Sequence, residues 1–181
     1  MRKTDLNYPI YPRQTKKQPG STPLPFKLLL YCTLVVVVGI SGCADRQKVY
    51  EQLYLVEEEG WYNEDFLRFR FEITDTTVPY NFYIDVRNSV EYPYSNLFLF
   101  VRTVLPDQQH AQDTLDIWMA DPEGRWLGSG IGKYRDRRVL IMPAFRFPMA
   151  GEYQFEIEHA MREPLLSGIA AAGIRVERYA E

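Results

Sequence analysis

Cysteine and histidine are scarce in this chain, and their scarcity excludes several kinds of chemistry. The 181 residues hold two cysteines and two histidines. Both cysteines lie early, at Cys32 and Cys43, so the part of the chain beyond them has no disulfide, thiol nucleophile or thiolate metal site. His110 and His159 are far apart and form no HxH or HExxH motif. We therefore predict neither a zinc site nor nucleophilic catalysis.

The two histidines have structural interpretations instead. His159 continues the inward positions of Tyr153, Phe155 and Ile157 at the end of a predicted strand. It is expected to be a hydrogen-bonded side chain at the rim of the core. His110 lies in the polar stretch DQQHAQD and is expected to be exposed.

Acidic residues do not indicate an active site either. Glu152, Glu156 and Glu158 alternate on one face of a predicted strand, where a carboxylate pair could serve glycoside hydrolysis, but solvated outward positions are the expected case. The run 57–59 is expected to be a solvated turn, because three consecutive side chains cannot converge on a cation without a shaped loop. No catalytic, cofactor-binding or metal-binding residue is predicted.

The stretch RWLGSGIGKYRD has three alternating glycines before a lysine, as a phosphate-binding loop would. The nucleotide motif, however, requires a glycine where Leu127 stands and a serine or threonine where Tyr134 stands. A dinucleotide fingerprint fails as well, because no βαβ unit surrounds the stretch. We predict instead a strand end and a tight connection, in which Gly130 and Gly132 permit positive φ or close packing and Trp126 covers an end of the core.

The distribution of charge argues against a nucleic-acid partner. The chain has 21 Lys and Arg and 24 Asp and Glu, of which six basic and one acidic residue lie in the first 42 positions. The remaining 15 basic and 23 acidic residues give residues 43–181 a formal charge of −8. This charge also disfavours an anionic membrane surface as partner.

The N-terminal 42 residues are typical of a lipoprotein signal peptide. A long basic leader precedes LLLYCTLVVVVGI, which has no charge and no proline. This apolar run is shorter than the about 20 residues that a membrane-spanning helix needs. It ends in ISGC, which is typical of a bacterial lipobox, where the cysteine receives diacylglycerol and the chain is cut before it. We predict a signal peptide over 1–42, lipidation at Cys43 and a lipidated tether and entry segment over 43–64.

Apolar residues alternate with polar ones from residue 65 onward, which predicts an all-β domain over 65–181. NLFLFVRTVL is apolar at five successive positions, Leu97 to Val101, and is expected to be a central strand covered on both faces. RVLIMPAFRF predicts a short apolar strand that stops at Pro143. MREPLLSGIAAAG has weak helical character, limited to a turn or two by its proline and glycines.

These segments predict a two-layer antiparallel β-sandwich of about seven or eight strands, immunoglobulin-like or jelly-roll-like, with a closed barrel as the alternative. Turn-forming residues separate the strands. Tyr153 follows Gly151 and Glu152 at the start of a late strand, and its hydroxyl is expected to reach a nearby loop backbone.

Aromatic residues make up 14% of the chain. Six of them fall in predicted loops or at outward positions: Trp61, Tyr62, Tyr92, Tyr94, Trp118 and Trp126. Such rings either close the ends of the sandwich or form a surface that stacks on sugars or binds a protein. The candidate partner-contact residues are Trp126, Tyr92, Tyr94, Trp118, Gly130 and Gly132.

Three segments follow the lipobox in collinear order: EYPYSNLFLFV (91–101), DTLDIWMADPEGRWLGSGIGKYRD (113–136) and FPMAGEYQFEIEHAMREPLLSGIAAAGIRVE (147–177). Together they resemble the GldH family of gliding-motility lipoproteins of Bacteroidota. The resemblance implies an outer-membrane-associated lipoprotein that serves gliding and the type IX secretion system. It implies other gliding and secretion lipoproteins and envelope proteins as partners, and no enzymatic activity.

Only Cys43 takes a defined chemical role from this resemblance. The residues after it, ADRQ, lack the acidic stretch associated with export to the cell surface, so we expect the periplasmic leaflet of the outer membrane. Two hypotheses follow for function. One is a noncatalytic subunit of the gliding and secretion apparatus, and the alternative is a carbohydrate-binding envelope lipoprotein.

Overall fold

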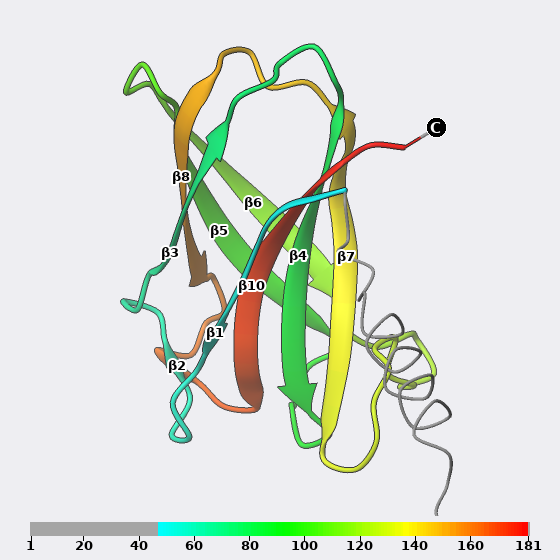
Figure 1. The fold of residues 1–181 in the computed structure, drawn as a ribbon. Helices are drawn as coiled ribbons and strands as arrows, with labels where there is room; N and C mark the ends of the chain where they lie inside the picture. The colour runs from blue at the N-terminus through cyan, green and yellow to red at the C-terminus, as the bar shows by residue number, and fades with distance from the viewer. Residues whose placement is uncertain (1–46, 181) are drawn as a thin grey trace, which may run out of the picture. The chain divides into compact units, whose positions relative to one another are not determined.

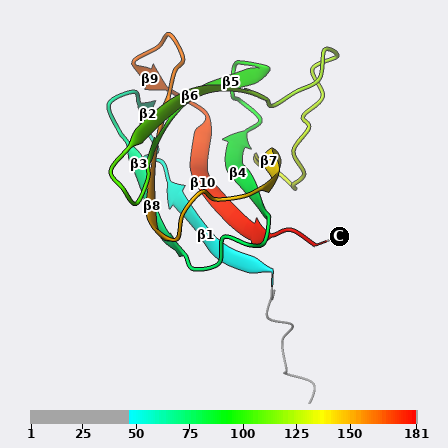
Figure 2. The ribbon, with the colours of Figure 1, turned by 90° about the horizontal axis from the view of Figure 1, so that it is seen from above.

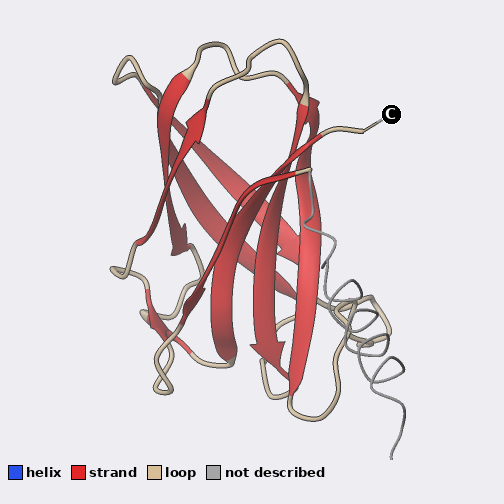
Figure 3. Cartoon of the chain, viewed as in Figure 1, coloured by secondary structure: helices blue, strands red, loops and turns tan. Residues whose placement is uncertain are grey.

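A computed structural model describes residues 47–180, which form ten strands and no helix (Figure 3). The first sheet has the order β1-β10-β4-β7 and the second the order β3-β8-β5-β6, with every pairing antiparallel. The strands of the first sheet are β1 (Lys48–Leu55), β10 (Ile169–Arg178), β4 (Tyr80–Ser89) and β7 (Tyr134–Phe145). Those of the second are β3 (Leu67–Ile73), β8 (Gly151–His159), β5 (Asn96–Val104) and β6 (His110–Trp118). A third pair joins β2 (Trp61–Tyr62) to β9 (Leu165–Leu166).

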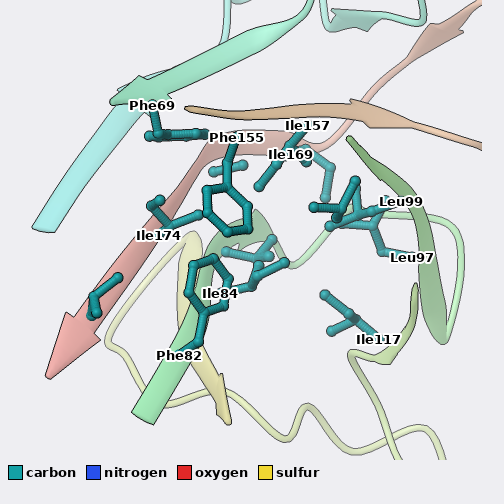
Figure 4. Close-up of a cluster of buried hydrophobic side chains, with 14 of the residues drawn as sticks. Phe69, Phe82, Ile84, Leu97, Leu99, Ile117, Phe155, Ile157, Ile169 and Ile174 are labelled. Carbon is teal, nitrogen blue, oxygen red and sulfur yellow. The ribbon is translucent and has the colours of Figure 1, made fainter. Parts of the chain in front are cut away.

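The two four-stranded sheets face each other as layers, as the views in Figures 1 and 2 show. Side chains from both sheets fill the space between them, among them Phe82 and Ile84 from β4 and Phe155 and Ile157 from β8 (Figure 4). The Phe82 and Phe155 rings stack with centroids 4.8 Å apart. The predicted β-sandwich is therefore confirmed. Within the described range, no helix is long and apolar enough to cross a membrane.

Several local predictions are confirmed. Tyr153 is buried, and its hydroxyl donates a hydrogen bond to the Met149 carbonyl oxygen at 2.9 Å. The acidic run 57–59 lies exposed in a turn after β1. The inward positions of β3 and β8 are those that the alternation predicts, since Phe69, Phe155 and Ile157 are all buried.

The predicted end of a strand at Pro143 is wrong, because β7 continues to Phe145. β7 lies at the edge of the first sheet and pairs only with β4. A proline lacks a backbone N–H, and an edge strand tolerates that loss on its open side. The register between β4 and β7 shifts on both sides of Phe82, next to the part of β7 that contains Pro143.

The weak helical character predicted between Met161 and Gly173 is also wrong. β9 and the first half of β10 occupy this segment, and its alanines pair with β4 and β1. Small side chains suit this place, because a Cβ on Gly173 would lie 2.2 Å from the Gln52 carbonyl oxygen. β1 itself lies within 43–64, where the sequence predicted no strand.

The connection between β6 and β7 folds back along the edge of β7, since Ser129 pairs with Asp136. Gly130 has a φ of 151°, and an added Cβ would lie 2.5 Å from the Tyr134 carbonyl oxygen. Gly132 has a φ of 73° but no atom within 4 Å of its Cβ position. The predicted tight, glycine-dependent connection is therefore confirmed, and the two glycines serve different needs.

Gly130→Ala should destabilise the fold more than Gly132→Ala. In Gly130→Ala the new Cβ clashes with the backbone and the φ is unfavourable for alanine, so the free energy of unfolding should fall by about 2–3 kcal/mol. In Gly132→Ala only the φ is unfavourable, so the loss should be about 1 kcal/mol. Urea unfolding of both variants would measure the two free energies. Equal losses would show that the close approach of Tyr134 to Gly130 does not matter.

Candidate functional site

An aromatic patch covers part of the outer face of the second sheet. Phe98 and Phe100 occupy successive outward positions on β5, and each is 37% exposed. Trp118 on the neighbouring strand β6 is 53% exposed and lies opposite Asn96, diagonal to Phe98. We call the following five residues the aromatic patch: Tyr94, Phe98, Phe100, Trp118 and Met161.

A depression of 650 Å³ lies within this patch. Its lining consists of Tyr94, Phe98, Phe100, Thr114, Ala160, Met161, Arg162 and Glu163. The Phe98 backbone N–H points at the Met161 sulfur at 3.4 Å, which ties the segment after β8 to β5. The Tyr94 hydroxyl donates to the Glu163 carboxylate, and this hydrogen bond raises the pKa of Tyr94. The depression is mostly apolar, with charged groups at its rim.

The other end of the same face is charged. The Glu156 carboxylate on β8 accepts hydrogen bonds from Arg68 at 2.9 Å and from Arg102 at 3.0 Å. These two bonds lower the pKa of Glu156, with Arg68 the larger cause. Both guanidinium groups lie 5.7 Å from the centre of the Phe66 ring. The prediction that the outward acids of β8 are simply solvated is therefore wrong for Glu156, although Glu152 is exposed.

The outer face of the first sheet is built differently, around a ladder of ion pairs. The Glu51 carboxylate on β1 accepts hydrogen bonds from Lys48, Arg138 and Arg175. The bonds from Lys48 and then Arg175 are the largest causes that lower the pKa of Glu51 to about 2. Arg138 also binds Asp85 through two hydrogen bonds of 2.7 and 2.8 Å. The exposed apolar residues of this face alternate with charged groups: Val49, Leu53, Leu55, Tyr134 and Leu140.

The structure places the predicted contact residues in three settings. Tyr94 and Trp118 belong to the aromatic patch. Gly130 and Gly132 lie in the turn before β7, and Trp126 packs partly against the core, as predicted. Tyr62, 44% exposed, lies outside the patch on β2. Cys43 lies outside the described residues, so its lipidation stays a prediction.

The prediction that Tyr92 is exposed is wrong. Its ring is 4% exposed, and its hydroxyl donates a hydrogen bond to the Asn96 carbonyl oxygen at 2.8 Å. Burial raises the pKa of this hydroxyl. Trp61 is buried too, and its indole N–H donates to the Asp65 carbonyl oxygen at 2.9 Å. Both rings close the end of the sandwich and are not available to a partner.

Sequence reasoning missed Phe98, Phe100 and Met161 as surface residues. The continuous apolar run suggested a strand covered on both faces, and β5 is indeed central in its sheet. Its outer face is nevertheless open. The polar residues at the same outward parity, Asn96 and Arg102, could have indicated this.

His159 lies beneath this region and is 2% exposed. Its ring contacts the Trp61 ring edge-on, with centroids 5.6 Å apart. Neither ring nitrogen has a hydrogen-bond partner among residues 47–180, so the prediction of a hydrogen-bonded histidine is wrong in that respect. Burial lowers the pKa of His159, and the nearby Trp61 and Pro164 backbone and Glu163 carboxylate oppose this shift only in part. His110 is exposed, as predicted.

The fold and the patch define an all-β sandwich domain with an exposed aromatic patch on one sheet face. The chain belongs to the GldH lipoprotein family, because the family model for GldH lipoprotein matches residues 48–176. A gliding motility lipoprotein GldH homolog of Christiangramia forsetii is 30% identical over 156 residues, covering 82% of this chain and 94% of that protein. The gliding motility lipoprotein GldH of Flavobacterium johnsoniae is 28% identical over 152 residues, covering 80% and 93%. The resemblance predicted from the sequence is confirmed, and the family is one of lipoproteins, not a known enzyme family.

His159→Leu should reduce the loss of stability that the chain suffers between about pH 7 and pH 5. The folded pKa of His159 is lowered, so its contribution is complete above the unfolded pKa and is lost as the pH falls from that value through the folded pKa. One histidine changes the free energy of unfolding by at most about 1.4 kcal/mol per pH unit. Carboxylates whose pKa is lowered in the folded state, such as that of Glu51, change the stability only at more acidic pH.

Urea unfolding at several pH values would measure this effect, with His110→Gln as the matched control at an exposed histidine. The control should keep the parent pH dependence. An unchanged pH dependence in His159→Leu would show that His159 is not its source.

Proposed function

We propose that this chain is a noncatalytic, lipid-anchored component of the gliding machinery that acts through protein–protein contacts. The observation that carries this proposal is the gathering of exposed aromatic side chains around a 650 Å³ depression on one sheet face. Exposed apolar patches rimmed by charge are typical of protein interaction sites, and aromatic anchors supply most of the binding energy there. Arg162 and Glu163 provide such a rim.

Family membership supports the setting of this activity. The relatives in Christiangramia forsetii and Flavobacterium johnsoniae are both named for gliding motility. We extend the proposal to the type IX secretion apparatus, with other gliding and secretion lipoproteins and envelope proteins as partners. We further propose that lipid on Cys43 holds the domain at the periplasmic leaflet of the outer membrane.

Carbohydrate binding is the alternative function, and the structure changes which residue would serve it. Trp126 packs partly against the core, whereas Trp118 presents its ring on the open sheet face. Stacking on a sugar would therefore use Trp118. Saturable sugar binding that is lost in Trp118→Ala, measured by tryptophan fluorescence, would favour this alternative over protein contact.

The double change Phe98→Ser and Phe100→Ser should abolish partner binding while leaving the fold intact, because both side chains lie on the outer face. Losing two aromatic anchors at about 2 kcal/mol each predicts a loss of affinity of several hundredfold. Quantitative co-purification of gliding and secretion proteins with the tagged full chain, together with complementation of gliding in a deletion strain, would measure it.

Leu140→Ser is the matched control for this experiment, since Leu140 is exposed on the outer face of the other sheet. It should retain partners and gliding. A double variant that retains the parent's partners in full would refute the patch as the contact surface.

Cys43→Ser should leave the chain uncleaved or unattached, because serine has no thiol to receive diacylglycerol. Fractionation of cells into membrane and soluble proteins, with metabolic labelling by a fatty acid, would measure attachment. Ser41→Ala keeps a small residue in the lipobox and should be processed normally. Normal membrane attachment of Cys43→Ser would contradict the predicted anchor.

A further inference from the structure

The four edges of the two sheets are not equally available for pairing. β1 and β3 lie against each other at one side of the sandwich, where the Tyr54 hydroxyl donates to the Arg68 carbonyl oxygen at 2.8 Å. At the edge of β7, the bridge between Ser129 and Asp136 covers one part, and Pro143 removes a donor from another. Bulges, prolines and covering loops are the usual protection of exposed edges. β1, β3 and β7 are therefore protected.

β6 lacks these protections. It is a regular strand of nine residues, paired with β5 without a bulge or proline, and it forms an outer edge of the second sheet. Most of its residues are exposed, and no other strand within 47–180 pairs with its free edge. The β5–β6 hairpin extends beyond the body of the sandwich at the upper left of Figure 1. Such an edge can pair with a further strand.

The backbone direction of β6 follows from its two ends. The Gln109 carbonyl oxygen accepts from the Leu105 N–H at 2.9 Å, and the Met119 N–H donates to the Ser95 carbonyl oxygen at 2.7 Å. Odd-numbered residues therefore direct their backbone groups toward β5, because these groups alternate along an antiparallel strand. The residues that direct their N–H and C=O toward the free edge are His110, Gln112, Thr114, Asp116 and Trp118.

We propose that β6 pairs antiparallel with β6 of a second copy of this chain, about a twofold axis at Thr114. A twofold axis perpendicular to the sheet keeps each side chain on its own face, so even-numbered residues oppose even-numbered ones. Thr114 then faces its own counterpart, Gln112 faces Asp116, and His110 faces Trp118. All nine residues of β6 take part, and the five outward-directed residues of each copy supply the hydrogen bonds.

The charges of β6 select this register. Moving the axis to Asp113 or Asp116 would place a carboxylate directly opposite itself, which destabilises a strand pair. Moving it to Leu115 avoids that conflict but leaves His110 and Ala111 unpaired. With the axis at Thr114, Asp113 faces Leu115 and Asp116 faces Gln112, so no carboxylate opposes another. The two aspartates therefore oppose the registers centred on Asp113 and Asp116, and the number of paired residues favours Thr114 over Leu115.

This pairing would join two four-stranded sheets into one continuous sheet. Because the axis is perpendicular to the sheet, the aromatic patches of both copies lie on the same face. Thr114, which lines the depression, lies at the centre of the combined surface. A partner would meet two patches side by side. The dimer does not depend on the identity of that partner.

Thr114→Cys in the full-length chain, treated in cells with a short bifunctional thiol reagent, tests the pairing directly. Residues 47–180 contain no cysteine, and the parent chain with Cys32 and Cys43 sets the background. A covalent homodimer is expected for Thr114→Cys. Thr74→Cys is the matched control, since this exposed threonine follows β3 at the opposite edge of the second sheet, and it should stay monomeric.

Equal crosslinking of the two variants, or none at Thr114→Cys, would refute the proposal. A crosslink from Thr114→Cys to a different protein would also refute it, since a strand of another partner would then occupy the edge.

Opposite charges introduced at position 114 in two copies distinguish pairing of β6 with itself from other contacts. Two copies of Thr114→Asp, or two of Thr114→Lys, would oppose like charges at the axis and should each lower homodimer recovery about fivefold. One copy of each should restore recovery to the parent level. Co-purification of two differently tagged full-length chains in mild detergent would measure it.

Recovery of the mixed pair no better than that of each variant alone would refute the twofold at Thr114. Phe98→Ser with Phe100→Ser should leave the dimer intact, so a failure of the proposed function and a failure of the dimer give different results.

Discussion

The stacking of Phe82 on Phe155 joins the two sheets, and the rest of the domain depends on packing of this kind. Their ring centroids lie 4.8 Å apart, with one ring on β4 and the other on β8. Residues 47–180 contain no cysteine, so apolar burial holds the layers together without a disulfide. Each fully buried aromatic or aliphatic side chain contributes about 1.5–3 kcal/mol. The same contact fixes strand parity, because every second residue must then face outward.

The alternation of inward and outward residues along each strand also made much of the fold predictable from the sequence. The alternation of Tyr153, Phe155 and Ile157 predicted β8 and its inward face, and the place of Tyr153 after Gly151 predicted its hydrogen bond to a nearby loop. β1 was not predictable in the same way, since its inward residues include Gln52 and its outward residues include Leu53. Its place depends on β10, which begins 121 residues after the start of β1 and offers Gly173 where the backbones approach.

The candidate site was predictable only in part, for a related reason. Trp118 and Tyr94 could be identified as surface rings from their loop or outward positions. Phe98 and Phe100 could not be distinguished from core residues, because an apolar run looks alike whether or not a layer covers its outer face. The pairing of Glu156 with Arg68 and Arg102 joins residues 88 and 54 positions apart, so no local pattern indicates it.

The two outer faces therefore differ in what they can bind. On the first sheet, the Glu51 carboxylate accepts hydrogen bonds from Lys48, Arg138 and Arg175 across the strands, and the bonds from Lys48 and Arg175 lower its pKa to about 2. A partner would have to break those ion pairs or match them. On the second sheet, Glu156 holds Arg68 and Arg102 at one end, while Phe98 and Phe100 lie around the depression with Asp116 and Glu158 opposite them on the neighbouring strands. A depression lined by exposed rings, which the charged face of the first sheet does not offer at Glu51, is what favours the second sheet for the proposed partner contact.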